Sequence, residues 1–306
     1  MSGERSFTAL YMKTDPIIRA KATVTLDGDG GTPVCVHALD PAMSKALEGS
    51  GGTIWRANGC SVQVNSNSVS SVVLSGSSSV TSEENCFVGG VSQGLAGVTP
   101  PPTPGCETKP DPFAALPKPD TSGACDFTSF SRDKSMTLSP GLYCGGLTLK
   151  NATFTFEPGL YIIKDGAFVT SGGATLIGDG VSFFLTGNNA GVTWSGGGNY
   201  QLSATRAGPM AGFVVYLDPN ANRLAKSVVS GSGNTFYEGA LYFPNQKLEL
   251  SGGSSAATPS PFTAFIARNF LFSGGSTLSI NVAPDKSTVP IPAGLYPGSG
   301  NPRLIN

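Results

Sequence analysis

Six cysteines are the residues of this chain with the clearest covalent chemistry, and all of them lie in its first half. They are Cys35, Cys60, Cys86, Cys106, Cys125 and Cys144. Their number is even, and none of them forms a C-x-x-C pair. Among the many pairings we expect the nearest-neighbour set, which joins 35 to 60, 86 to 106 and 125 to 144. Such disulfides would place the chain in an oxidising compartment, the periplasm or outside the cell. The alternative is a cytosolic protein with buried free thiols.

A single histidine limits both metal and nucleophile chemistry. His37 is the only one, so the combined supply of cysteine and histidine is poor for a zinc site. It lies two residues from Cys35, and a Cys–His nucleophile pair would need a thiolate. Because an oxidised cysteine is no nucleophile, we expect no such pair.

Carboxylates are the remaining candidates for catalysis, because acid–base work on polysaccharides needs two or three of them on one face. The candidates are Asp165, Asp179, Asp218, Glu238 and Glu249. Asp165 and Asp179 stand in Asp-Gly turns and Asp218 precedes a proline, and at such positions aspartate favours the turn itself. The sequence therefore predicts no catalytic residue and no cofactor.

A glycine-rich acidic phrase resembles the start of a calcium loop. It is Asp27-Gly28-Asp29-Gly30-Gly31. An EF-hand loop needs a glutamate at its last position, and this chain has Ala38 there. We therefore expect a tight turn between two strands and no metal site.

The composition indicates a chain of strands and turns with a real core. It contains 41 Gly and 23 Pro, and only 13% of its residues are charged. Glycine and proline interrupt helices, and serine and threonine compete for backbone hydrogen bonds. The net charge is −1 and no basic run stands out, so nucleic-acid binding has little support.

No apolar run is long enough to span a membrane. The opening Met1-Ser-Gly-Glu-Arg lacks the apolar region of a signal peptide. We expect the chain to be a segment from which an export signal or a membrane anchor has been removed.

A short phrase recurs from Gly145 onward: an apolar run, Ser-Gly or an equivalent, a few small residues and another apolar run. The second residues of its copies lie at 150, 171, 195, 230, 251 and 273, with spacings of 21, 24, 35, 21 and 22 residues. Each period divides into three strand-sized pieces, for example Leu160–Ile163, Ala167–Thr170 and Ala174–Ile177. Three short strands in a coil of 21–24 residues predict a right-handed parallel β-helix, a solenoid in which each strand pairs with its equivalent one coil away. A two-sheet sandwich is the alternative.

The recurring phrase marks a sharp corner, which often needs a positive φ and therefore glycine. The expected corner residues are Asn151, Gly172, Gly196, Gly231, Gly252 and Gly274. Asn151 stands in the copy that lacks glycine, and asparagine tolerates the left-handed region best among the other residues. This substitution supports the alignment of the copies.

The chain is expected to form one continuous domain. Its parts are capping strands (1–34, with a strand within 8–26), irregular disulfide-stapled first coils (35–98), a Pro-rich surface loop (99–124), regular coils (125–285) and a C-terminal tail (286–306). Ser50-Gly51-Gly52 and Leu74-Ser75-Gly76 resemble the recurring phrase. Because proline lacks a backbone donor, the Pro-rich loop cannot join a ladder and should run extended over the surface.

Several phrases resemble those of one known family. They run from Cys35 to Pro41, Asn58 to Ser66, Cys125 to Phe127, Leu138 to Gly146, Pro158 to Gly166 and Gly239 to Pro244. Between residues 33 and 280 the chain resembles the extracytoplasmic domain of TadE/TadG-like proteins, the pilus-assembly family of bacterial tight-adherence systems. The resemblance implies association with envelope-spanning pilus machinery and no known reaction. Members usually carry an N-terminal transmembrane helix, and Cys86 and Cys106 fall outside the pattern, which suggests a local extra staple.

The sequence thus predicts a non-enzymatic structural or interaction protein of the bacterial periplasm or cell surface, associated with pilus assembly or adhesion. Its expected partners are pilus or envelope proteins. The alternatives are a carbohydrate-binding or carbohydrate-active β-helix, with a glycan as partner, and a phage- or adhesin-like spike. The long coil between residues 195 and 230 is the first place to look for a partner site.

Aromatic side chains distinguish these alternatives in part, since an exposed row would indicate a sugar or protein interface. Most of them fall within apolar strand runs, so we expect them to stack in the core. They are Trp194, Tyr200, Tyr216, Phe236, Tyr237 and Tyr242.

Overall fold

The computed structural model describes residues 24–25, 31–92, 97–231, 235–251, 260–275, 277–296 and 303–304. Their regular structure is β-strand, apart from short 3-10 turns such as η3 (Pro284–Lys286) and η4 (Ala293–Leu295). The prediction of an all-β chain is therefore confirmed. Most of the strands join into one large sheet with parallel pairing, in three ladders.

The first ladder runs the whole length of the molecule. In spatial order its strands are β9 (Phe127–Arg132), β11 (Gly141–Lys150), β13 (Gly159–Lys164), β16 (Val181–Thr186), β20 (Phe213–Leu217), β23 (Phe236–Ser251), β24 (Thr263–Ser273), β2 (Val34–Ala38), β4 (Ile54–Val64) and β6 (Ser79–Phe87). Side chains alternate between the core and the outer face along each strand.

The second ladder follows the first around a corner. It passes through β9, β11, β14 (Phe168–Ser171), β18 (Val192–Gly198), β22 (Lys226–Gly231), β23, β24, β3 (Leu47–Gly49), β5 (Val72–Leu74) and β7 (Val91–Ser92). β11 and β23 bend at this corner and so belong to both ladders. The pairings therefore close a ring of eight parallel strands, β11-β13-β16-β20-β23-β22-β18-β14, and further strands extend it.

The third ladder is in two parts. One part contains β10 (Met136–Leu138), β12 (Thr153–Phe156), β15 (Thr175–Gly178), β19 (Tyr200–Ser203) and the start of β23. The other contains β25 (Thr277–Asn281), β4, β6 and β8 (Val98–Thr99). Two short pairs lie outside the ladders: β17 (Asn188–Ala190) with β21 (Asn222–Arg223), and β1 (Val24–Thr25) with β26 (Arg303–Leu304). Apart from β1, the expected strand within 8–26 lies outside the described residues.

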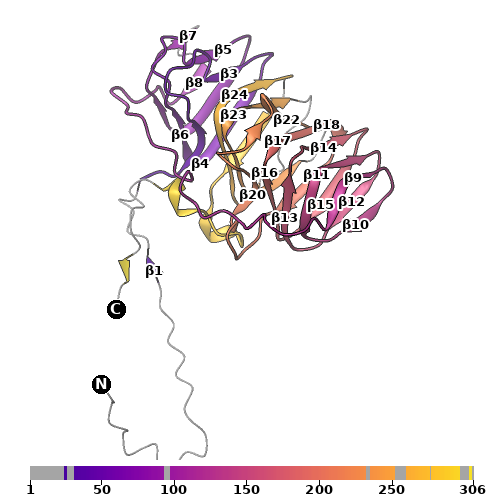
Figure 1. Cartoon of the computed structure of the whole chain (residues 1–306). Helices are drawn as coiled ribbons and strands as arrows, with labels where there is room; N and C mark the ends of the chain where they lie inside the picture. The colour runs from indigo at the N-terminus through magenta and orange to yellow at the C-terminus, as the bar shows by residue number, and fades with distance from the viewer. Residues whose placement is uncertain are drawn as a thin grey trace, which may run out of the picture.

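The spatial order of the strands differs from their order in the chain. The strands of residues 34–99, expected to form the first coils, stack on the last strands of the C-terminal half. β2 pairs with β24, with His37 opposite Ile266, and β25 pairs with β4. Figure 1 shows the indigo strands of the N-terminal half against the orange strand β24. The N-terminal half (β2–β8) and the C-terminal half (β9–β25) thus form one stack. At the junction, β24 and β25 pair with β2 and β4, which are far from them in the chain.

The junction is packed and hydrogen-bonded like an interior. Trp55 of the N-terminal half is fully buried, and its ring meets Phe270 and Phe272 edge-on at centroid distances of 5.8 and 5.0 Å. Arg268 Nε donates to Asp40 Oδ2 at 2.9 Å across the same boundary. Aromatic burial of this kind dominates the stability of such contacts.

Corner geometry agrees with the recurring phrase at most of its copies. The φ values are 56° at Asn151, 64° at Gly172, 85° at Gly196 and 95° at Gly274. Gly231 ends β22 opposite Gly198, and Gly252 lies outside the described residues. The phrase at Ser50 falls in line with the copy at Ser273, because Ser50 N donates to Phe272 O at 2.9 Å. The corner therefore forms one column through both halves.

Asn151 provides a direct test of this corner. Replacing it with valine should lower the free energy of unfolding by about 2 kcal/mol, because a β-branched residue is strained at positive φ. Asn151→Gly should stay within about 0.5 kcal/mol of the parent, as for a neutral surface change. Urea unfolding of both variants checks this, and equal losses for valine and glycine would show that φ is not what matters there.

Candidate functional site

A Pro-rich strap is the most distinctive feature of the surface. We define it as residues 100–126, which connect β8 to β9. Because β8 and β9 lie at opposite ends of the stack, the strap must travel its full length, and Figure 1 shows it along one side of the body. The expectation of an extended surface segment agrees with this path.

Disulfides fasten the strap at both ends. Cys86–Cys106 ties its beginning to β6, and Cys125–Cys144 ties its end to β11. The third bridge, Cys35–Cys60, joins the neighbouring strands β2 and β4. These are the predicted nearest-neighbour pairs, and no described cysteine is free. The local extra staple inferred at Cys86 and Cys106 is one of the two anchors of the strap.

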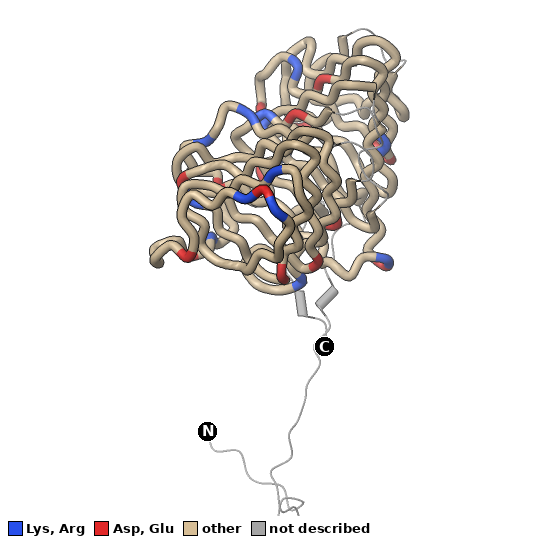
Figure 2. Tube along the Cα trace, turned by 90° about the vertical axis from the view of Figure 1, so that its right-hand side faces the viewer, with Lys and Arg blue, Asp and Glu red and all other residues tan. Residues whose placement is uncertain are grey.

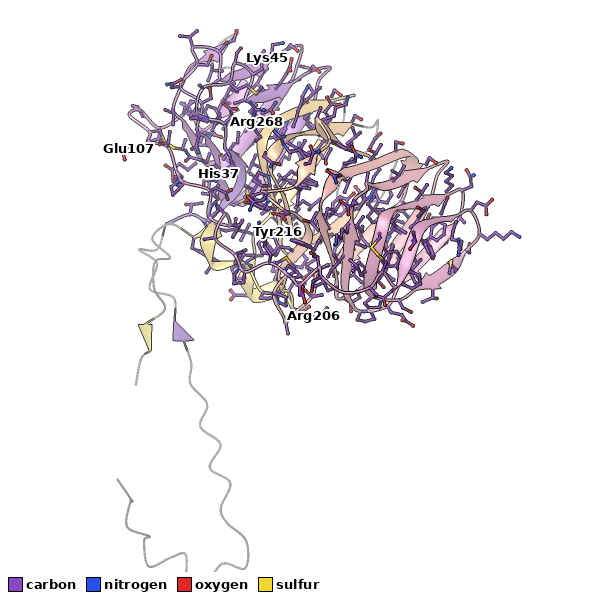
Figure 3. The ribbon with its side chains drawn as sticks, in the orientation of Figure 1. His37, Lys45, Glu107, Arg206, Tyr216 and Arg268 are labelled. Atoms are coloured by element: carbon purple, nitrogen blue, oxygen red, sulfur yellow. A yellow bond between two sulfur atoms is a disulfide. The ribbon has the colours of Figure 1, made fainter. Side chains whose placement is uncertain are left out.

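The strap covers the outer face of the first ladder. One register column of outward side chains runs beneath it, which we call the outer column: Ile162, Phe184, Tyr216, Tyr242, Ile266, His37, Gln63 and Cys86. From β11 to β6 this ladder spans about 38 Å at about 4.8 Å per strand. The chain from Cys106 to Cys125 extends to about 59 Å as polyproline II, so it is long enough to cover that distance. Figure 3 shows His37 and Tyr216 following one another along the body, with Glu107 at its outer edge.

Side chains of the ladder bind backbone groups of the strap. In the N-terminal half, Asn85 Nδ2 donates to Pro100 O at 2.8 Å and Gln63 Nε2 donates to Glu107 O at 3.0 Å. Asn65 pairs with both backbone groups of Lys109. Its Nδ2 donates to the carbonyl at 2.7 Å, and its Oδ1 accepts from the amide N–H at 2.9 Å.

The same mode of contact continues in the C-terminal half. Tyr216 Oη donates to Phe113 O at 2.9 Å, and Lys164 Nζ donates to Thr121 O at 3.1 Å. Contacts to backbone carbonyls and amides do not depend on the identity of the strap residue. The ladder therefore recognises an extended chain largely by its main chain.

Phe113 is the apolar anchor of the strap. It is 2% exposed and packs edge-on against Phe213 and Tyr242, at 4.9 and 5.6 Å between centroids. Two residues earlier, Asp111 Oδ2 accepts from Tyr242 Oη at 2.7 Å. Burial raises the pKa of Asp111, against the opposing effect of its hydrogen bonds from Tyr242 and from Phe113 N–H. Asp111-Pro112-Phe113 is thus the only strap segment among the described residues that is held by specific side-chain contacts and an aromatic pocket together.

An ion pair follows further along the strap. Lys118 Nζ lies 2.6 Å from Asp218 Oδ1, and Thr186 Oγ1 donates to Asp218 Oδ2 at 2.7 Å. Burial acts to raise the pKa of Asp218, but the Lys118 ammonium and the hydrogen bonds from Asn220 and Thr186 outweigh it, and the pKa is lowered. Asp218, considered above as a catalytic candidate, therefore holds the strap.

The other candidate carboxylates are engaged separately. Their partners are Asn188 for Asp165, Arg206 for Asp179, Ser203 and Ser287 for Glu238, and Lys226 and Lys247 for Glu249. No group of three or more His, Cys, Asp or Glu within the described ranges is arranged to hold a metal ion. Residues 27–30 of the glycine-rich acidic phrase lie outside those ranges. Figure 2 shows the few charges scattered, with both signs mixed.

The segment between 195 and 230 contributes Phe213, Tyr216 and Asp218 to the contacts with the strap. Ser182, Thr205 and the Met210 carbonyl bond one another there, and Arg206 reaches Asp179 and Thr288. The aromatic candidates divide into two groups. Trp194, Tyr200 and Tyr237 are buried in the core, whereas Tyr216 and Tyr242 are buried beneath the strap, and Phe236 is half-buried.

His37 is buried where the strap, β2 and the C-terminal segment meet. A cavity of about 50 Å³ beside it is also lined by Lys109, Pro112 and Leu295, among others. Burial lowers the pKa of His37 to about 4; a hydrogen bond to Asn65 opposes this and the Lys109 ammonium adds to it. His37 is therefore a neutral packing residue of the outer column near pH 7, and its neighbour Cys35 is oxidised.

This buried histidine predicts a loss of stability in acid. Its ordinary pKa in the unfolded chain is about 6.5, so between pH 6.5 and 4 the unfolded state binds a proton that the folded state does not. Stability should therefore fall as the pH falls through this window, by about 3 kcal/mol in total. Denaturant unfolding from pH 7.5 to 4 measures this. His37→Gln should flatten that part of the profile, and an unchanged slope in the variant would contradict the assignment.

Comparison with known proteins does not assign this chain to a family. No protein-family model, curated protein or solved structure matches this chain. No helix in the described part of the chain is long and apolar enough to cross a membrane. The three disulfides indicate an oxidising, extracytoplasmic environment.

Proposed function

We propose that this chain is a right-handed parallel β-helix that serves as a non-enzymatic structural and interaction module at a bacterial cell surface or in the periplasm. The observation that carries the proposal is the strap, which is fixed by disulfides at both ends and clamps two stacked halves. Such cross-links lower the conformational entropy of the unfolded chain and so stabilise the folded state. This stabilisation is typical of proteins that function outside the cell.

The lack of a catalytic constellation supports a non-enzymatic role. Each candidate carboxylate within the described residues has its own structural partner, and the histidine is buried and neutral. The carbohydrate alternative needs an exposed aromatic platform, whereas the candidate aromatics are buried or half-buried. No contact among the described residues favours the phage- or adhesin-like spike.

Association with tight-adherence pilus machinery is the specific form of the proposal, and it rests on the resemblance to TadE/TadG-like proteins. The partners would be pilus or envelope proteins. Deletion of the gene in its own host should reduce piliation and surface attachment, and the parent gene should restore both. A complementing variant with Cys86, Cys106, Cys125 and Cys144 replaced by serine should restore less. Normal piliation and attachment in the deletion strain would reject the pilus role.

A further inference from the structure

The face beneath the strap has the features of a groove for an extended peptide. Amide, phenol and ammonium donors bind carbonyls at Glu107, Lys109, Phe113 and Thr121 of the strap. The Asn65 amide binds both the N–H and the C=O of a single residue. Peptide grooves commonly combine main-chain hydrogen bonds for affinity with one or two side-chain pockets for specificity.

The pockets of this groove select a short acidic and aromatic sequence. Phe113 fills the aromatic pocket made by Phe213 and Tyr242, while Asp111 receives the Tyr242 hydroxyl. Lys118 adds a charge pair with Asp218. The ligand that fits is therefore an extended, proline-rich chain with an Asp-Pro-Phe core and a basic residue five positions after the phenylalanine.

We infer that this groove binds the strap of a second copy of the chain whenever its own strap is not tied down. The second copy is the occupant that the contacts specify, because its residues 107–121 carry the same sequence and would make the same bonds. With both anchors closed, the tethered strap has a high effective concentration and excludes a competitor. With the anchors open, only the main-chain links to β8 and β9 hold the strap, its free length grows, and exchange between two copies gives a reciprocal dimer with the same strap-to-groove contacts. This goes beyond the proposed function, which would stand without it.

A labelled peptide of residues 107–121 tests the groove directly. Fluorescence anisotropy should show little binding to the oxidised parent chain. The full chain with Cys86, Cys106, Cys125 and Cys144 replaced by serine should bind it at least about tenfold more tightly, since only the main-chain links to β8 and β9 then hold its strap over the groove. The same peptide with Phe113→Ala should lose at least about tenfold in affinity, as expected for a buried aromatic anchor.

A second variant keeps the test decisive if the serine variant fails to fold. The disulfide-intact Phe113→Ala chain retains its strap but not its anchor, so it should bind the parent peptide more tightly than the oxidised parent does. Light scattering should also find dimers of the serine variant that added Phe113→Ala removes. If neither folded variant, checked by circular dichroism, binds the peptide, the groove serves its own strap alone and the inference is overturned. Piliation assays are independent of this result.

Discussion

Replacing Cys86, Cys106, Cys125 and Cys144 with serine should lower the free energy of unfolding by about 6 kcal/mol, about 3 kcal/mol for each bridge. The two bridges close loops of similar length, with sequence separations of 20 and 19 residues. They lie at opposite ends of the stack, so their effects should add. Guanidinium unfolding of the oxidised parent and the variant gives the difference.

The matched control is Cys35→Ser with Cys60→Ser. This bridge has a separation of 25 residues and should cost a similar amount, about 3 kcal/mol, but it leaves the strap tied. Limited proteolysis should therefore cut the strap in the four-serine variant and spare it in the control. A four-serine variant that loses less than about 1 kcal/mol and resists proteolysis would show that the strap needs no anchors.

Trp55→Ala should be among the most damaging single core changes, with a loss of about 3–5 kcal/mol. The indole is fully buried and crosses the junction to Phe270 and Phe272. Its removal should loosen the N-terminal half in particular. Hydrogen exchange should accelerate over residues 34–99 more than over residues 127–231.

Trp194→Ala is the control for this effect. Trp194 is equally buried but packs on Phe168 within the C-terminal half. We expect a comparable loss of stability, with faster exchange around β14 and β18. The same exchange pattern in both variants would mean that Trp55 does not hold a junction between two halves.

Much of the local structure could be predicted from the sequence because it depends on local rules. Glycine at a corner and asparagine at Asn151 reflect the same positive φ, and the three strand-sized pieces expected from Leu160 onward correspond to β13, β14 and β15. Of the three expected bridges, Cys35–Cys60 joins the paired strands β2 and β4 of a parallel ladder, whereas the other two fasten the strap.

The order in which the strands of the two halves stack could not be predicted in the same way. Coils of equal length with the same inward and outward alternation can stack on one another in any order, so the repeat leaves the order open. The length of the Pro-rich segment, residues 99–124, was the one feature of the sequence that indicated a different stacking order. A connection between adjacent coils needs only a few residues, whereas this one is long enough to return along the whole stack.

The outer column was missed for a related reason. His37 and Gln63 alternate with apolar residues and so have the pattern of surface positions. They are buried because a distant segment covers them. Only the strap explains why polar and aromatic side chains are concentrated on that face.

Oxidative cross-linking across the junction tests the account most directly. Leu271 and Glu48 are register partners on the outer face of the second ladder. Neighbouring strands bring Cα atoms within the range that a disulfide needs, so the double variant L271C and E48C should form a new disulfide. Peptide mass mapping would detect it. Val169 lies five strands from Glu48 in that ladder, so V169C with E48C is the matched negative control. We predict a bridge only in the first pair. A bridge between S92C and S131C, which stacking in chain order would bring together, with none between L271C and E48C, would contradict the account.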